Sequence, residues 1–261
     1  MLISISTSIF PSEVNPTYLL AYLQKIKSAG FDYVELGRKH TNISPRIEEI
    51  ESTGVKVWAV HGDLPRNALS SDNSLRLKAV EEELKRMEDT AVYAPCPYVI
   101  HYLDRVLDPR PGRQFRKSVE QLHEKAKELG FILSLETAPY KPQVNERYPD
   151  SEEIANFVRS FESPNMRVTV DINHSNLKED LIQVAANCRG IIGNIHVSDN
   201  MGKWEDHLPP GEGNINIRGV LLALIKCGYA GPCNVECHHP HPTIPVLKQI
   251  KINTEKICKD L

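Results

Sequence analysis

The chain has 261 residues, of which 41% are apolar and 25% are charged, and its formal net charge is −3. This composition is ordinary for a globular protein with a large buried core and excludes a disordered or fibrous chain. The sequence has no basic tail and no apolar run near the ~20 residues of a membrane span. We therefore expect neither a nucleic acid nor a membrane as partner.

The cysteines indicate a reducing compartment. Six cysteines are scattered along the chain and none forms a C-x-x-C pair: Cys96, Cys188, Cys227, Cys233, Cys237 and Cys258. The first ten residues, MLISISTSIF, lack a basic region and are too short for the apolar core of a signal peptide. We expect free thiols and a cytoplasmic location.

Strand-like and helix-like patterns alternate along the chain. Short apolar, β-branched runs predict strands at 2–7, 31–36, 55–61, 97–103, 131–136, 166–171, 191–197 and 231–237. Amphipathic segments predict helices at 15–30, 44–53, 75–90, 113–129, 150–161, 177–188, 217–228 and 243–258. Glycines at or just after several helices, such as Gly30, Gly54 and Gly130, are typical helix C-caps.

Eight strands, each followed by a helix, predict an α/β protein: one domain over 1–261, folded as a single parallel (β/α)8 TIM barrel. An open doubly wound sheet is the alternative topology. It requires a glycine-rich phosphate loop after the first strand, and the stretch SISTSIFPSE has none. The same absence gives no support for a bound nucleotide.

Four successive strands in the second half end in a metal-binding side chain. The runs are FILSLE, MRVTVD, GNIHV and CNVE, which carry Glu136, Asp171, His196 and Glu236. In a closed parallel barrel these strand ends meet at one mouth, where active sites of such barrels lie. Two glutamates, one aspartate and one histidine suit one divalent ion, with Mn²⁺ the first choice and Mg²⁺, Co²⁺ or Zn²⁺ as alternatives.

Further ionisable residues are expected at the same mouth: Glu35, His61, His101, His174, Glu205 and His207. Their predicted role is substrate contact, except for Glu205. Each has an alternative, since Glu35 can pair with Arg38 or Lys39 and the histidines can bond to neighbouring carbonyls. His123, on a polar helix face, is expected to be solvated.

These residues stand in short motifs whose order resembles the xylose isomerase-like TIM-barrel superfamily, the sugar isomerases and epimerases that also include endonuclease IV. The resemblance spans all eight strands. Its carriers are F-D-Y-V-E-L, A-V-H-G, V-I-H, L-E-T-A-P, V-D-I-N-H, N-I-H-V-S-D, H-L-P-P-G-E-G-N-I-N and N-V-E.

The resemblance implies a divalent metal held by Glu136, Asp171, His196 and Glu236. It also implies that Glu136 and Glu236 act as acid and base on the substrate carbon, through a metal-stabilised cis-enediolate. The expected substrate is a small sugar or polyol ketone, and His174 would bond one of its oxygens. A homo-oligomer is compatible with the family.

Two alternatives remain open. Glu136 is followed by TAPYKP where ketose epimerases carry an Asn-Arg segment, so an inosose dehydratase-type reaction is one alternative. The other is zinc-dependent cleavage of abasic DNA, as in endonuclease IV, whose nine ligand positions match His61, His101, Glu136, Asp171, His174, His196, Glu205, His207 and Glu236. Glu205 departs from that family's aspartate, and the chain lacks a basic stripe for phosphate neutralisation.

Overall fold

The structure is a computed structural model that describes residues 1–10, 16–39, 47–104, 111–141, 143 and 147–261. The ends of two predicted helices, at 15 and at 44–46, lie outside the described residues. All statements below concern the described part of the chain.

Eight strands form one parallel sheet: β1 (Ile3–Ser6), β2 (Tyr33–Leu36), β3 (Lys56–His61), β4 (Pro97–His101), β5 (Ile132–Glu136), β6 (Met166–Asp171), β7 (Ile192–His196) and β8 (Cys233–Val235). Their spatial order is β7-β6-β5-β4-β3-β2-β1-β8. A parallel bridge between Val197 and Val235 joins the two ends of the sheet, so the predicted (β/α)8 barrel is confirmed.

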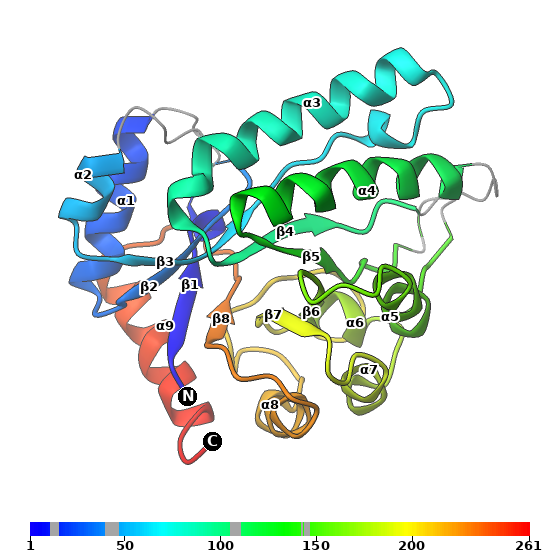
Figure 1. Ribbon diagram of the computed structural model, residues 1–261. Helices are drawn as coiled ribbons and strands as arrows, with labels where there is room; N and C mark the ends of the chain where they lie inside the picture. The colour runs from blue at the N-terminus through cyan, green and yellow to red at the C-terminus, as the bar shows by residue number, and fades with distance from the viewer. Residues whose placement is uncertain (11–15, 40–46, 105–110, 142, 144–146) are drawn as a thin grey trace.

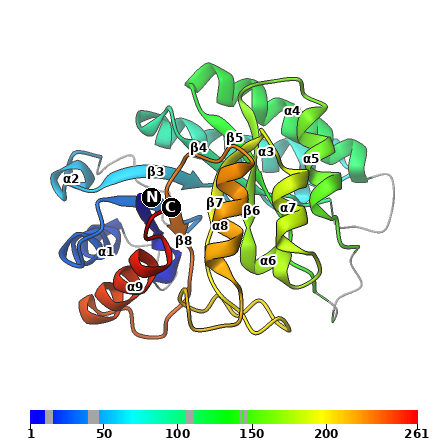
Figure 2. The same ribbon diagram turned by 90° about the horizontal axis from the view of Figure 1, so that it is seen from below.

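Helices surround this barrel (Figure 1). The α-helices are α1 (Pro16–Ser28), α2 (Ile47–Ser52), α3 (Asn73–Thr90), α4 (Pro111–Leu129), α5 (Ser151–Arg159), α6 (Ile172–Asn176), α7 (Leu181–Asn187), α8 (Ile217–Lys226) and α9 (Ile244–Ile257). Short 3-10 turns among the described residues include η1 (Thr7–Ile9), η3 (Arg66–Leu69) and η4 (Ala91–Tyr93). Figure 2 shows α7 and α8 side by side on the outside of β6 and β7.

The helix predicted over 177–188 is α7, which begins only at Leu181, and a short helix that was not predicted, α6, precedes it. Asp171 caps α6, since its Oδ1 accepts a hydrogen bond from the backbone N–H of His174 at 2.9 Å. Asp180 caps α7 in the same way through the N–H groups of Ile182 and Gln183. Each aspartate satisfies N–H groups that a helix start leaves open, so each begins a helix of its own. His174 therefore lies on a helical turn directly after β6.

The prediction that His123 is solvated is wrong. Its side chain is buried on α4, and its Nε2 lies 2.8 Å from Ser163 Oγ. The adjacent positions Val119, Leu122 and Ala126 are buried as well, so this helix face packs against the barrel. Hydrogen bonding to Ser163 lets an imidazole occupy that face.

Polar side chains fill the barrel interior below the mouth. Glu35 Oε2 accepts hydrogen bonds from the amides of Asn194 at 3.1 Å and Asn234 at 2.9 Å. Trp58 Nε1 donates to Asn194 Oδ1 at 3.0 Å. Because buried polar groups are stable only when hydrogen-bonded, this interior network ties β2, β3, β7 and β8 together beneath the site.

Close packing after β3 fixes the segment that follows His61. A Cβ atom on Gly62 would lie 2.0 Å from Glu83 Oε1 and 2.8 Å from Tyr98 Cε1. Glu83 is buried, where it accepts hydrogen bonds from the Tyr98 hydroxyl and the Asp63 N–H. We expect Gly62→Ala to lower the free energy of unfolding by about 1–3 kcal/mol, because there is no space for an extra methyl group between Glu83 and Tyr98. Urea denaturation measures this, and an unchanged midpoint would contradict it.

Candidate metal centre

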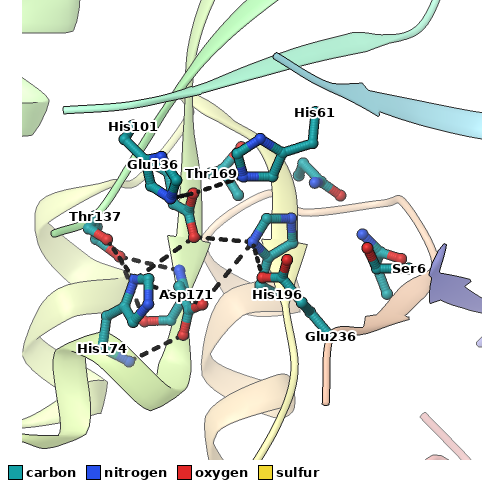
Figure 3. A network of polar contacts seen from close by, with 12 residues as sticks. Ser6, His61, His101, Glu136, Thr137, Thr169, Asp171, His174, His196 and Glu236 are labelled. Carbon is teal, nitrogen blue, oxygen red and sulfur yellow. Dashed lines mark hydrogen bonds and ion pairs between the residues drawn. The ribbon is translucent and has the colours of Figure 1, made fainter. Parts of the chain in front are cut away.

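Four strand ends bring three carboxylates and one imidazole together at the barrel mouth (Figure 3). One potential ligand atom from each of Glu136, Asp171, His196 and Glu236 lies within 4.8 Å of the others. The first three residues end β5, β6 and β7, and Glu236 directly follows β8. The arrangement arises because neighbouring parallel strands end at the same rim of a barrel.

His196 sits at the centre of this group. Its Nδ1 lies 3.0 Å from Glu136 Oε1 and 2.8 Å from Glu236 Oε2. On the other side of the ring, Nε2 lies 2.9 Å from Glu35 Oε2. This second contact fixes the orientation of the ring, as carboxylates commonly do for metal-binding histidines.

The donor set fits a divalent cation. Asp171 Oδ2 is buried and has no hydrogen-bond partner among the described residues, although Oδ1 caps α6. A buried carboxylate oxygen without a partner is costly, and a cation at this point would compensate it. Oxygen ligands with one imidazole suit Mn²⁺, Mg²⁺, Co²⁺ or Zn²⁺.

The electrostatics of the group also favour a cation. Burial alone would raise the pKa of Glu136, but the facing imidazoles of His101 and His196 hold its pKa well below its usual range. Burial raises the pKa of Asp171 to about 6, partly offset by His174. Burial would lower the pKa of His196, but the carboxylates of Glu236, Glu35 and Glu136 raise it well above its usual value.

A pH dependence of metal binding follows from His196. With its pKa raised, His196 is protonated at neutral pH in the metal-free protein, so a bound ion displaces a proton. We expect the affinity for Mn²⁺ to increase from about pH 6 to about pH 8, by roughly tenfold per pH unit for each proton released. Calorimetry in two buffers of different ionisation enthalpy measures this release. A pH-independent affinity without proton release would contradict it.

A cavity of about 330 Å³ opens above the group. Its lining includes all four histidines that were predicted to contact substrate: His61, His101, His174 and His207. The Nε2 atoms of His61 and His101 lie 3.1 Å and 3.2 Å from Glu136 Oε2. The structure thus places these two imidazoles on one side of the shared glutamate.

His174, Glu205 and His207 form the opposite side of the cavity. Glu205 Oε1 lies 3.4 Å from His174 Nε2 and 3.3 Å from His207 Nε2, so this glutamate contacts both rings. Its Oε2 lies 3.2 Å from Lys141 Nζ. Burial would raise the pKa of Glu205, but the two histidines hold it below its usual range.

The donor atoms therefore fall into overlapping groups. Besides the central four, three sets of three donors lie close together: His61, His101 and Glu136; His61, His196 and Glu236; and Asp171, His174 and His207. Glu205 stands where endonuclease IV has an aspartate, which counted against DNA cleavage in the sequence. Because Glu205 contacts the imidazoles of both His174 and His207, this departure counts less against that activity.

Glu35 does not lie where a substrate contact was predicted. It is fully buried and does not line the cavity, and its carboxylate points into the barrel toward His196, Asn194 and Asn234. The alternative pairing with Arg38 or Lys39 is likewise not its arrangement. Glu35 instead holds Nε2 of His196, the ring nitrogen that points away from the donor group. Sequence reasoning missed Asn194 and Asn234 because amides on buried strands resemble ordinary core positions.

The support from Glu35 predicts a measurable effect on metal binding. Glu35→Gln replaces an acceptor by an amide and weakens the hold on His196 Nε2. We expect the affinity for Mn²⁺ to fall about 10–100-fold, as for other residues that orient a metal-binding histidine. Titration calorimetry checks this, with Glu212→Gln, an exposed glutamate outside the cavity lining, as control. Equal affinities of the two variants would contradict the role.

Comparison with known proteins places the chain in a family. The model of the family described as "Xylose isomerase-like TIM barrel" matches residues 23–256. The chain belongs to the xylose isomerase-like TIM barrel family. An uncharacterized protein of Methanocaldococcus jannaschii is 28% identical over 269 residues, 94% of this chain and 89% of that protein. A second uncharacterized protein of the same organism is 32% identical over 110 residues, 42% of this chain and 41% of that protein.

Solved structures of sugar epimerases share the fold. A D-tagatose 3-epimerase-like protein has a TM-score of 0.81 at 22% identity, over 99% of this chain and 97% of that one. An L-ribulose 3-epimerase has a TM-score of 0.81 at 19% identity, over 99% and 96%. A 3-keto-D-glucoside 4-epimerase from E. coli has a TM-score of 0.77 at 17% identity, over 97% and 98%. At these identities the likeness is one of fold.

The cysteines and the helices bear on two other expectations from the sequence. The six cysteines are free, as predicted, and all six are buried. Among the described helices, none has both the length and the apolar character that a membrane crossing needs. The cytoplasmic location and the oligomeric state stay predictions.

Proposed function

We propose that this protein is a divalent-metal-dependent isomerase or epimerase of a small carbohydrate. The observation that carries the proposal is the group of Glu136, Asp171, His196 and Glu236 at the floor of a cavity of about 330 Å³. Two of these residues are glutamates from separate strands, as an acid–base pair requires. The cavity volume is in the range of about 300–1,000 Å³ typical of small-molecule sites. Relatives of similar fold named as ketose epimerases support the substrate class.

Glu136 and Glu236 carry the proton transfers in this proposal. Glu136 removes the proton next to the substrate carbonyl, and Glu236 delivers a proton to the opposite face for epimerisation. A bound divalent ion supplies Lewis-acid polarisation of the substrate oxygens. Neighbouring imidazoles hold Glu136 ionised, which is the form that a general base needs. Glu236 is held ionised as well, so it takes up a proton from solvent before it delivers one to the substrate.

The histidines that line the cavity orient the substrate. His174 is fixed by its ring contact from Nδ1 to the Thr137 carbonyl oxygen at 2.9 Å, which leaves Nε2 toward Glu205 and the cavity. His61 is fixed similarly, with Nδ1 2.8 Å from the Gly62 carbonyl oxygen. Rings held through Nδ1 direct Nε2 toward the neighbouring glutamate and the cavity, where a substrate hydroxyl can share that nitrogen with the glutamate. We assign His101 and His207 the same role.

A substrate panel tests the proposal. Ketoses, inososes and hydroxypyruvate are incubated with the protein and Mn²⁺, Mg²⁺ or Co²⁺ in D₂O, and products are read by NMR. We expect one class to show metal-dependent product formation with deuterium at the carbon next to the carbonyl. Loss of water instead would identify a dehydratase-type lyase. No product and no deuterium with any member of the panel would contradict the proposal.

One observation favours a second candidate function, zinc-dependent cleavage of a phosphodiester at an abasic site. Three of the overlapping donor groups could hold three ions, with Glu136 and Asp171 shared between them. Multinuclear sites of this kind stabilise both the attacking and the leaving oxygen. The formal net charge of −3 argues against duplex binding, which needs neutralisation of several phosphates.

A further inference from the structure

Positively charged side chains line the upper part of the cavity. Arg38 lies two residues after β2, Arg66 is the first residue of η3 after β3, and Lys141 follows β5. The proposed chemistry uses the carboxylates and imidazoles of the floor and gives these three residues no role. A neutral sugar needs no cations at its binding site, so their position calls for an explanation.

Lys141 has an evident partner inside the site. Its Nζ lies 3.2 Å from Glu205 Oε2, so its charge is matched by a residue of the floor. Arg38 and Arg66 come from neighbouring loops, after adjacent strands β2 and β3. They therefore lie on the same side of the mouth, opposite the contact of Lys141 with Glu205.

Arg38 lines the cavity together with His101, which ends β4, and His238, which follows β8. Its NH1 also lies 3.8 Å from Asp63 Oδ1, and a guanidinium has five N–H donors with which to hold a second oxyanion.

The backbone beside Arg38 is held in a fixed position. The Gly37 N–H donates to Thr7 Oγ1 at 2.8 Å, and a Cβ atom on Gly37 would lie 2.9 Å from the Ser8 backbone nitrogen. This close approach joins the end of β2 to η1. It also places Arg38 beside Ser8, which lines the cavity and whose buried Oγ has no hydrogen-bond partner among the described residues. A buried hydroxyl of this kind is a donor suited to a ligand oxygen.

We propose that Arg38, Arg66 and Ser8 form an anion subsite, and that the substrate is therefore an acidic sugar, carrying either a phosphate ester or a carboxylate. The inference rests on the proposed function for the part of the substrate that reacts over Glu136 and Glu236. The anionic group binds at the mouth while the carbonyl end reaches the floor. A bidentate contact from an arginine to such a group fixes orientation as well as affinity.

Binding of inorganic phosphate to the metal-free protein tests the subsite without any reaction. We expect saturable one-to-one binding by calorimetry, and a loss of at least about tenfold in affinity in each of Arg38→Gln and Arg66→Gln, since each removes a charged hydrogen bond. Lys226→Gln is the control, because this exposed residue ends α8 at the opposite end of the barrel and should change affinity by less than about twofold. Both arginines are exposed, so thermal unfolding of the variants should match wild type. Unchanged phosphate binding in both variants, or no saturable binding in wild type, overturns the subsite.

Kinetics separate this inference from the proposed function. Arg38→Gln should raise KM for a ketose phosphate or a keto sugar acid at least about tenfold more than it raises KM for the neutral ketose, because only the acidic substrates lose a charged hydrogen bond. The better of the two acidic substrates identifies the anion. Turnover confined to neutral ketoses overturns the subsite while the epimerase proposal stands. Phosphate binding that depends on Arg38 without turnover of any ketose keeps the subsite and contradicts the epimerase. If a DNA duplex binds more tightly than inorganic phosphate, and this binding depends on Arg38, the assignment to a small substrate is overturned.

Discussion

Replacement of Glu136 by glutamine should abolish turnover while the barrel remains folded. Glu136 contributes a carboxylate to the proposed metal group and is the proposed base, and its oxygens also face His61, His101 and His196. The amide keeps the size of the side chain but can neither accept the substrate proton nor carry the charge. We expect kcat to fall about 10⁴-fold, the upper end for loss of a general base. Steady-state assays on the substrate found by the panel measure it.

The control for this variant is Glu152→Gln. Glu152 lies exposed in the first turn of α5, outside the cavity lining, and the chemical change is the same. It should leave turnover at the wild-type value. Thermal unfolding of Glu136→Gln should remain cooperative, which separates loss of chemistry from loss of fold. If Glu136→Gln retains more than about a tenth of the wild-type kcat, Glu136 is not the general base, because loss of a general base lowers kcat by at least about 100-fold.

The second large effect concerns the ion itself. At a Mn²⁺ concentration of about 100 times its Kd, binding to the native state alone should stabilise the protein by about 2.7 kcal/mol. For a chain of this size we expect a rise in Tm of roughly 5–10 °C. Asp171→Asn should abolish this rise, since it removes the charge of the carboxylate whose buried Oδ2 lacks a hydrogen-bond partner among the described residues.

The chain offers a matched control for this variant as well. Asp180→Asn changes the aspartate that caps α7, as Asp171 caps α6, but it lies outside the donor groups. Asparagine is a good N-cap, so neither variant should lose much stability in the absence of metal. Asp180→Asn should keep the full metal-induced rise in Tm. An equal rise in Asp171→Asn would show that the ion binds elsewhere.

The barrel fold and the meeting of four metal-binding side chains at its mouth could be predicted from the sequence for one physical reason. Parallel strands with both faces buried read as short apolar runs, and their carboxyl ends share one rim. A carboxylate or imidazole at the end of each such run therefore implies a common site. Glu136, Asp171, His196 and Glu236 carried that pattern, and the structure brings them within 4.8 Å.

Features that depend on side-chain direction or on local caps could not be predicted in this way. Asp171 is a strand end, a proposed ligand and a helix cap at once, so a short helix that the periodicity did not predict, α6, follows it directly. Glu35 occupies a strand position whose side chain points into the barrel, below the cavity. Arg38 and Arg66 lie in loops, where sequence spacing gives no direction. Only the folded structure shows that both line the cavity.

Counting bound metal is the most direct test of the central claim that one ion serves the group at the barrel mouth. The purified protein is loaded with Mn²⁺ or Zn²⁺, its metal content is measured by mass spectrometry, and anomalous diffraction locates each ion. We expect about one ion per chain, bound by Glu136, Asp171, His196 and Glu236. Three zinc ions per chain, spread over the overlapping donor groups and accompanied by cleavage of abasic DNA, would contradict this claim.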